Sequence, residues 1–430
     1  MATTASASSL DRPALLDRFR RLRARTRELF GLLEASVYYE RPIALRNPIV
    51  FYEGHLPAFA VNTLVRKGLG APGIDADLEL IFARGIDPET EATAIARGNP
   101  AWPARETVAA YAAAADRLIE DAIASADLER PGHPLLDRAQ ALWAILEHEE
   151  MHQETLAYMW HQLPYGAKRK PPQYVTLSLS SAAGPSATVR VPAGVAVLGT
   201  DLENAPFAWD NELPPLAVQV PAFSIDADNV TNAAFMDFID AGGYGDPRWW
   251  RPEDWAWIVE EGLAHPAFWM REDGEWRWRG MFESVPLPPD WPVYVTWAEA
   301  SAYAAWRGGQ LPSEAQWVRA AEASEPGNCD FERWDPEPVG TRPESISRWG
   351  VRDLMGNGWE WTADVFAPFA GFTPLASYPE YSGDFFDGSH FVLKGGSPVT
   401  ARPLLRSGFR NWFRPRYPYV YATFRCVGER

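Results

Sequence analysis

The pattern of apolar and polar positions divides the chain into two parts. In the first third, four segments repeat apolar residues at the three- and four-residue spacing of amphipathic helices. They are residues 15–33, 56–66, 105–124 and 134–163. Helices of this number and spacing predict an up-and-down four-helix bundle, whose facing side chains can hold a metal ion.

A run of basic residues and prolines at 168–172 ends the helical pattern. Beyond it, residues 174–191 alternate as strands do, and the rest is dense in Gly, Pro, Trp and short β-like runs, interrupted by helical stretches at 232–241 and 297–306. We therefore expect a multidomain chain of class α and α+β. Its parts are a disordered tail at 1–10, a helical bundle at 11–167, a linker and first strand at 168–190, and an irregular α+β domain at 191–430.

Composition limits the partners and the compartment. The net charge of −17 repels phosphate backbones and anionic bilayers, so neither nucleic acid nor a membrane is expected as a partner. The first ten residues lack the apolar core of a signal peptide, and no apolar run is long enough to span a bilayer. The two cysteines, Cys329 and Cys426, indicate no disulfide framework. We expect a cytoplasmic protein.

The strongest chemical signal is a histidine pair. His148 and His152 lie four residues apart in a helical segment, which places both imidazoles on one helix face, about 5–6 Å apart at Cβ. His55 follows Gly54 in an aromatic run, where we expect it to open the second helix. In an antiparallel bundle the start of one helix can face the middle of another, so His55 is the expected third ligand. Three neutral imidazoles suit iron and zinc alike and leave open coordination positions.

Two other functions fit part of the pattern. The pair also reads as the H-E-x-x-H motif of zinc hydrolases, with Glu149 as the base. That motif needs a third ligand, but Tyr158 stands where one extension of it has histidine, and no acidic residue occurs between Glu154 and Asp201. A peptidase is disfavoured, although His55 can replace the missing ligand. The third possibility is a binding module whose aromatic domain captures a cationic ligand.

The second half contains a series of characteristic phrases, which are PVYVTW at 292–297, QLPSEAQW at 310–317, DLMGNGWEW at 353–361, LKGGS at 393–397 and FRC at 424–426. In this order they resemble the formylglycine-generating (sulfatase-modifying) domain over roughly residues 191–430. The resemblance implies a C-type-lectin-like, irregular α+β fold. Formylglycine generation itself is not expected, because Tyr421 and Cys426 stand where that family has two copper-binding cysteines.

The combination of an upstream histidine, an H-x-x-x-H-x-E helix and this aromatic domain resembles the non-haem iron sulfoxide synthases of ergothioneine and ovothiol biosynthesis. The resemblance implies a DinB-like four-helix bundle with Fe(II) bound by His55, His148 and His152. Members of that family use O2 to join hercynine (Nα-trimethylhistidine) or histidine to a thiol at the imidazole ring. Fe(II) as cofactor and O2 as co-substrate are therefore expected.

Within that family, a few positions indicate which substrate branch the chain resembles. Met151 stands where the ergothioneine enzymes have a glutamine, and Trp102 and Arg105 stand where the γ-glutamylcysteine type has paired arginines. Losing one arginine removes a bidentate carboxylate clamp and argues against a dipeptide thiol. The histidine segment looks most like selenoneine synthase, which couples hercynine to a selenosugar. A synthase that forms a C–S bond with cysteine or γ-glutamylcysteine is the alternative.

The resemblance also implies substrate contacts in the C-terminal part. Asn411 is expected to make a polar contact to hercynine, and Trp412 and Phe413 to lie near its trimethylammonium group, although a place in the core explains both rings equally well. A phenol near the iron can deliver a proton or an electron, and a structural role explains any single tyrosine as well. The expected phenols are Tyr378 and Tyr381, and the further substrate-binding residues are Arg105 and Tyr417.

Overall fold

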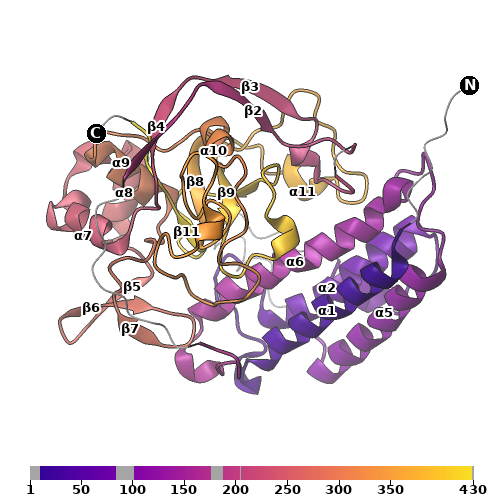
Figure 1. The fold of residues 1–430 in the computed structure, drawn as a ribbon. Coiled ribbons are helices and arrows are strands. Elements are labelled where there is room, and N and C mark those ends of the chain that lie inside the picture. The colour runs from indigo at the N-terminus through magenta and orange to yellow at the C-terminus, as the bar shows by residue number, and fades with distance from the viewer. Residues whose placement is uncertain (1–9, 84–100, 176–186, 204, 429–430) are drawn as a thin grey trace, which may run out of the picture. The chain divides into compact units, whose positions relative to one another are not determined.

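The computed structural model describes residues 10–83, 101–175, 187–203 and 205–428. Contacts divide the chain into two compact units, most of whose helices and strands are labelled in Figure 1. Unit 1 comprises residues 1–156 and 167–169, and unit 2 comprises 157–166 and 170–430. The expected tail, apart from Leu10, and residues 176–186 of the expected linker lie outside the described residues.

The predicted helical bundle is confirmed in unit 1. Its long helices are α1 (Arg12–Gly31), α2 (Ile49–Ala60), α5 (Arg105–Ser125) and α6 (Gln140–Gln162), and the short α3 (Ala76–Ile81) follows α2. The last residues of α6, from Ala157 on, cluster with unit 2. Apolar residues of α1 at the predicted spacing, such as Leu15, Phe19 and Leu22, are buried, which is why the periodicity in the sequence marked the helix.

The second helix begins earlier than predicted. It starts at Ile49, after the extended backbone of Pro48, and continues beyond Ala60 as the π-helix η2 (Val61–Gly68). The expectation that His55 opens this helix was wrong, because Gly54 lies inside it rather than in a turn. A Cβ atom at Gly54 would lie 2.4 Å from the ring of Phe82, so the glycine provides space for packing.

The fourth helix begins later than predicted. The sequence pattern extended from Pro134, but α6 starts at Gln140. Arg138 and Ala139 adopt positive φ angles of 56° and 57°, which interrupt the helical backbone before Gln140.

Buried polar contacts hold α6 against α1 and α5. The Arg23 guanidinium donates to Glu149 at 2.8 Å and to Asp116 at 2.6 Å. Four residues after Glu149, the Gln153 amide donates to the Leu22 carbonyl at 3.0 Å. Because Glu149 and Gln153 share one face of α6, these contacts fix the rotation of the helix that carries His148 and His152.

Unit 2 is an irregular α+β domain, as predicted. Its largest sheet has the order β10-β9-β8-β11, in which β8 pairs antiparallel with β9 and parallel with β11. These strands are β8 (Gly358–Val365), β9 (Phe391–Gly396), β10 (Asn411–Phe413) and β11 (Ala422–Thr423). The smaller sheets pair β1 (Thr188–Val191) with β4 (Phe223–Asp226), β2 (Gly194–Leu198) with β3 (Leu216–Val220), and β6 (Glu275–Arg279) with β5 (Trp269–Glu272) and β7 (Ser284–Pro286).

Short helices complete unit 2, and two of them, α7 and α9, lie where the sequence predicted helical stretches. The α-helices are α7 (Asn232–Asp240), α8 (Pro252–Glu261), α9 (Trp297–Trp306), α10 (Glu314–Ala320) and α11 (Glu380–Gly383). The 3₁₀ helices of the described chain are η1 (Ala35–Val37), η3 (Asp137–Ala139), η4 (Tyr165–Ala167), η5 (Asp210–Glu212), η6 (Gly243–Gly245), η7 (Pro247–Trp249), η8 (Pro343–Ser345) and η9 (Arg402–Leu404).

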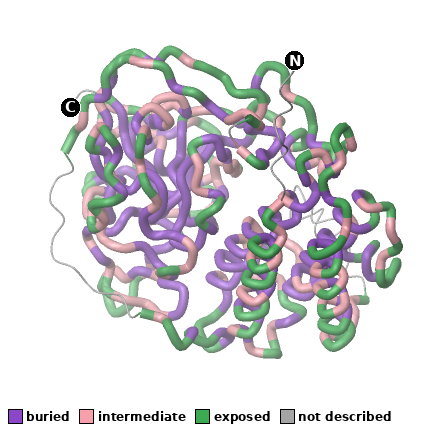
Figure 2. Tube along the Cα trace, turned by 45° about the vertical axis from the view of Figure 1, so that its right-hand side comes forward, coloured by how far each residue is buried: buried purple, intermediate pink, exposed green. Residues whose placement is uncertain are grey.

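Tryptophans and a buried ion pair form much of the core of unit 2, and β8 and β9 lie among its buried segments (Figure 2). The Trp317 indole donates to Glu360 at 2.9 Å, and the Arg425 guanidinium binds the same carboxylate at 2.6 Å. Other fully buried tryptophans of unit 2 are Trp160, Trp209, Trp269, Trp278, Trp291 and Trp361. Most of the aromatic richness of the sequence therefore serves packing.

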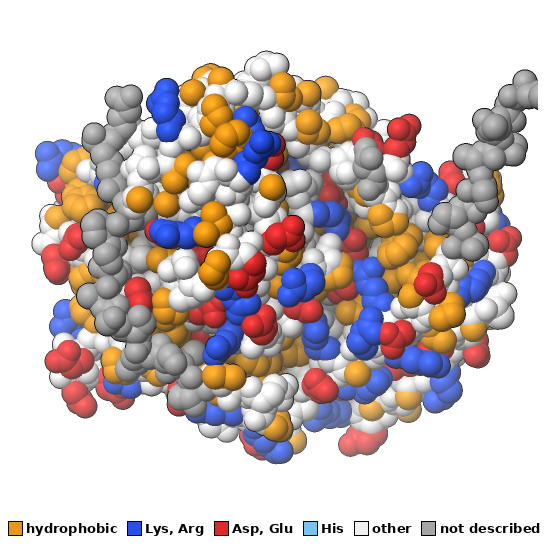
Figure 3. Space-filling model, viewed as in Figure 1, with side chains coloured by type: hydrophobic (Ala, Val, Ile, Leu, Met, Phe, Trp, Pro, Cys, Tyr) orange, Lys and Arg blue, Asp and Glu red, His pale blue; other side chains and the backbone are white. Residues whose placement is uncertain are grey.

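The exposed surface mixes both signs of charge. On the face drawn in Figure 3, acidic and basic side chains are interspersed. Among the described residues, no helix combines the length and the apolar character that crossing a membrane requires.

Candidate metal centre

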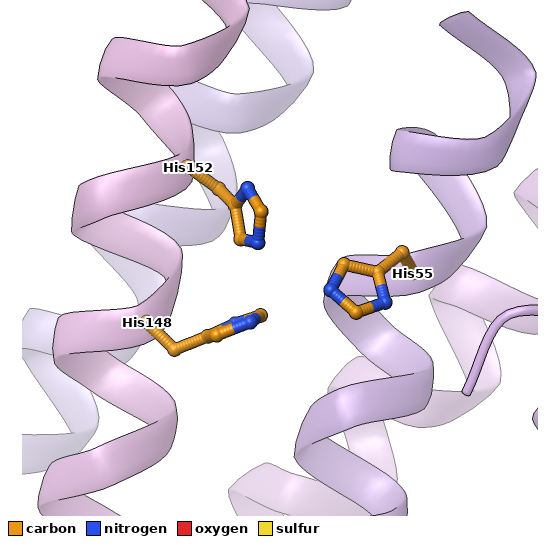
Figure 4. A group of neighbouring side chains, drawn as sticks. All are labelled: His55, His148 and His152. Carbon is orange, nitrogen blue, oxygen red and sulfur yellow. The ribbon is translucent and has the colours of Figure 1, made fainter. Parts of the chain in front are cut away.

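Three histidines from two helices of unit 1 meet in one place. His55 comes from the middle of α2, and His148 and His152 come from α6, one helical turn apart (Figure 4). One ring nitrogen of each lies within 4.8 Å of the corresponding nitrogens of the other two. The ring centroids are 4.4 Å apart for the pair on α6 and 5.1 Å from His55 to each of them.

Two of the rings are held by their surroundings. The Nδ1 atom of His55 lies 2.8 Å from the carbonyl oxygen of Phe82, and its ring stacks on Phe51 at 5.0 Å. The His148 ring stacks on Phe59 with centroids 3.6 Å apart and planes 9° from parallel. Sequence reasoning missed Phe82 and Phe59, because the helical pattern was read only from residue 56 and Gly54 was taken for a turn residue.

The donor set fits a divalent metal ion. Burial lowers the pKa of His55 to about 4, and it lowers the pKa values of His148 and His152 well below the usual range. Repulsion that the other histidines of the cluster would exert on a protonated ring adds to the effect for both, and Arg46 adds to it for His152. All three rings are therefore neutral at pH 7, as metal ligation requires. Within the described part of the chain, the buried His55 Nε2 and His152 Nδ1 atoms have no hydrogen-bond partner, each at a cost of about 1–3 kcal/mol. A ligated cation would remove part of that cost.

Glu149 belongs to a structural ion pair. Its Oε1 atom accepts from the Arg23 guanidinium at 2.8 Å and from the Thr26 hydroxyl at 2.5 Å, both on α1. A general base must instead reach a water molecule at the metal. This placement disfavours the zinc hydrolase that the H-E-x-x-H pattern suggested.

Arg105 is bound to a different side of α2. Its Nε atom lies 3.8 Å from Glu53, and its guanidinium lies 4.7 Å from the centre of the Tyr38 ring. The Tyr38 hydroxyl donates to the same Glu53 oxygen at 2.5 Å. Glu53 and His55 are two residues apart on a helix and point about 200° apart around its axis. The structure thus holds Arg105 against the face of α2 that points away from His55.

The other expected site residues lie in unit 2, around β10. The Trp412 ring stacks on Phe366 at 4.3 Å and meets Tyr381 edge-on at 5.2 Å. Tyr381 also contacts Tyr378, with ring centroids 5.8 Å apart. These residues form one aromatic cluster, which brings together both expected phenols and an expected cation-binding ring.

A second stack follows along the same strand. The Phe413 ring packs on Tyr417 at 5.2 Å and 11°, and Asn411 accepts a hydrogen bond from the Trp412 backbone N–H at 2.9 Å. Asn411, Trp412 and Phe413 are all half-buried, so part of this aromatic surface is accessible to solvent.

Contacts missed by sequence reasoning hold the tyrosine segment. The Ser382 hydroxyl donates to Asp210 at 2.5 Å, and the Leu375 backbone N–H donates to the other oxygen of that carboxylate at 3.2 Å. Trp209, beside Asp210, stacks on Tyr381 at 4.0 Å. The segment 375–382, which carries both tyrosines, is thus held at both ends by Asp210 and from one side by Trp209.

Comparison with known families agrees with the two units. The sulfatase-modifying factor enzyme 1-like domain family matches residues 177–430, and the DinB superfamily matches residues 18–156.

Curated relatives match between about half and nearly all of this chain. A hercynine oxygenase of Mycolicibacterium smegmatis is 36% identical over 312 residues, which are 66% of this chain and 71% of that protein. A hercynine oxygenase of Mycolicibacterium thermoresistibile is 40% identical over 256 residues, which are 54% of this chain and 56% of that protein. The ergothioneine biosynthesis protein 1 of Neurospora crassa is 26% identical and covers 93% of this chain. The chain spans 56% of the length of each of the latter two relatives.

Proposed function

Because the chain belongs to the family of the hercynine oxygenases, we propose that it is an Fe(II)- and O2-dependent synthase that joins hercynine to a selenium or sulfur donor. The observation that carries the proposal is the cluster of His55, His148 and His152, three neutral imidazoles whose donor atoms lie within 4.8 Å of one another. These rings would hold the iron. When bound, the ion supplies the redox chemistry of O2 and a common attachment point for both substrates.

The aromatic residues around β10 suit the cationic end of hercynine. A trimethylammonium group gains about 0.5–2 kcal/mol from each aromatic face that it meets in a desolvated site. Trp412 and Phe413 offer such faces, and Tyr417 holds the Phe413 ring by stacking. Asn411 supplies the polar contact, and Tyr378 or Tyr381 supplies a phenol that delivers a proton during the reaction.

The selenosugar is the donor that the helix residues favour. Met151 directly precedes His152 on α6 and is half-buried, and its polarisable thioether suits a soft selenium or sulfur atom. Trp102 has no charge and stacks on Phe82, while the Arg105 guanidinium already has Glu53 as its carboxylate partner. Positions 102 and 105 therefore provide no pair of arginines for the carboxylates of a dipeptide thiol, and a sugar needs none. Because Arg105 lies against the face of α2 that points away from His55, we do not assign it to donor binding.

The test is a coupling assay under air with hercynine and Fe(II). Parallel reactions receive a selenosugar, cysteine or γ-glutamylcysteine, and the product masses are compared. The proposal expects consumption of hercynine and a selenium-containing adduct. An adduct with cysteine or γ-glutamylcysteine alone supports the C–S synthase instead, and no consumption with any donor rejects both.

Metal content tests the ligand assignment. His55→Ala and His148→Ala should each lose bound iron and turnover, because each removes one of three nitrogen ligands. His265→Ala is the matched control, since that half-buried imidazole lies in unit 2 and bonds the Pro266 carbonyl. Full iron content and turnover in His55→Ala would show that this residue is not a ligand.

A further inference from the structure

The residue before His55 makes an unusually close contact. Gly54 lies inside α2, and a Cβ atom there would lie 2.4–2.5 Å from three carbon atoms of the Phe82 ring. Such distances are far below van der Waals contact, so the ring occupies the volume that any other residue would need for its side chain. Phe82 is fully buried at the end of α3, where its backbone N–H bonds the Leu78 carbonyl at 3.0 Å.

The same residue holds His55 through its backbone. The Phe82 carbonyl oxygen lies 2.8 Å from His55 Nδ1, and a carbonyl oxygen only accepts hydrogen bonds. Nδ1 therefore carries the proton of the neutral ring, and Nε2 carries the lone pair. Nε2 is buried without a hydrogen-bond partner among the described residues, and Figure 4 shows the ring facing the two histidines of α6.

Aromatic neighbours fix the Phe82 ring itself. Trp102 stacks on it at 6.1 Å and 17°, and Phe51 lies against it at 6.2 Å. Phe51 also stacks on the His55 ring at 5.0 Å. The ring of Phe82 is thus in contact with Gly54 and with two aromatic rings, which restrict its movement. Because the ring is fixed, the backbone carbonyl of the same residue is also held in place.

We infer that Phe82 is a positioning residue of the metal centre, whose ring over Gly54 holds its carbonyl on His55 and so aims Nε2 at the ion. The inference rests on the proposed function, since it takes His55 as a ligand. Partners that orient a ligating histidine through its other ring nitrogen commonly contribute about 10–100-fold to metal affinity. The Gly54–Phe82 contact has this role without touching the metal.

The experiment is a Co(II) titration of the metal-free full-length protein, followed by the visible absorption of the bound ion. Gly54→Ala should weaken Co(II) binding about 10–100-fold and change the spectrum, because the new methyl group displaces the Phe82 ring and its carbonyl. Gly31→Ala is the matched control, since it is also a helical glycine but a Cβ there meets nothing within 4 Å. Its affinity should equal that of the wild type.

A double variant separates positioning from general damage. Gly54→Ala combined with Phe82→Leu should recover part of the lost affinity, because the smaller side chain makes room for the methyl group. Folded Gly54→Ala protein with wild-type Co(II) affinity and spectrum would overturn the inference. If that variant does not fold, Phe82→Leu alone decides: weaker Co(II) binding with retained helical content supports the inference, and unchanged binding overturns it. A wild-type protein that binds no Co(II) would instead reject the metal centre of the proposed function.

Discussion

Substitution of Glu149 by glutamine separates the synthase from the zinc hydrolase. In a hydrolase, Glu149 is the general base, and its loss lowers turnover by about 10²–10⁴-fold. In the structure the carboxylate instead bonds Arg23 and Thr26 of α1. We therefore expect Glu149→Gln to lower the stability of the bundle and to leave the coupling of hercynine close to the wild-type rate.

The size of the stability loss follows from the contacts. The side chains of Glu149 and Arg23 are 5% and 6% exposed, so the pair is protected from solvent screening. A hydrogen bond to a charged group contributes about 1.5–3 kcal/mol. Glutamine keeps the shape and one acceptor oxygen, and Asp116 still binds Arg23 at 2.6 Å, so the arginine keeps one charged partner. The expected loss is about 2 kcal/mol, below the ~3–5 kcal/mol for a buried charge left alone.

The assay pairs urea unfolding, followed by far-ultraviolet circular dichroism, with iron content and coupling turnover. Glu120→Gln is the matched control, because Glu120 also pairs with an arginine of α1, Arg20, but at an exposed position. Its unfolding midpoint should equal that of the wild type. An unchanged midpoint in Glu149→Gln would refute the structural role, and a coupling turnover lowered 10²-fold or more would show that Glu149 acts in the reaction.

Two further predictions concern stability, one for each unit. The folded-state pKa of His55 is lowered to about 4 and those of His148 and His152 are lowered too, whereas the unfolded value is about 6.5. Below pH 6.5 the unfolded chain therefore binds more protons than the folded chain. The free energy of unfolding of the metal-free protein should be highest above pH 6.5. It should fall toward pH 4 by up to about 1.4 kcal/mol per pH unit for each histidine. Urea unfolding at several pH values between 4 and 7 measures this free energy, and a value that does not change with pH would contradict the burial of neutral rings. In unit 2, Arg425→Met should cost about 3–5 kcal/mol, because it leaves the fully buried Glu360 without its ion-pair partner. Thermal unfolding of this variant is compared with that of Arg348→Met, which changes an exposed arginine. Equal unfolding midpoints of the two variants would contradict the prediction.

Local patterns in the sequence predicted much of the fold. The apolar periodicity placed the helices of the bundle, and the spacing of His148 and His152 placed two imidazoles on one face of α6. The helix starts were predicted less well, since Gly54 resembles a turn residue in a sequence and a packing residue in a structure. Propensity cannot tell these apart, because the reason for the glycine is an aromatic ring 28 positions further along the chain.

The roles of polar residues on α6 also needed the structure. The motif alone suggested that Glu149 is a catalytic base. In the structure its carboxylate instead accepts hydrogen bonds from Arg23 and Thr26 of α1. Likewise, the sequence showed that positions 102 and 105 do not carry a pair of arginines, but it did not show that Glu53 is the partner of Arg105.

The sequence by itself determined the two-part architecture, the imidazole pair and the aromatic character of the second unit, because these depend on residues close together in the chain. Only the tertiary structure decided that His55 joins the pair from mid-helix, that Phe82 orients it, and that Glu149 faces α1. The physical reason is that the rotation and offset of packed helices are set by the summed contacts of distant side chains. A shift of one residue in any helix would turn a different side chain toward the centre.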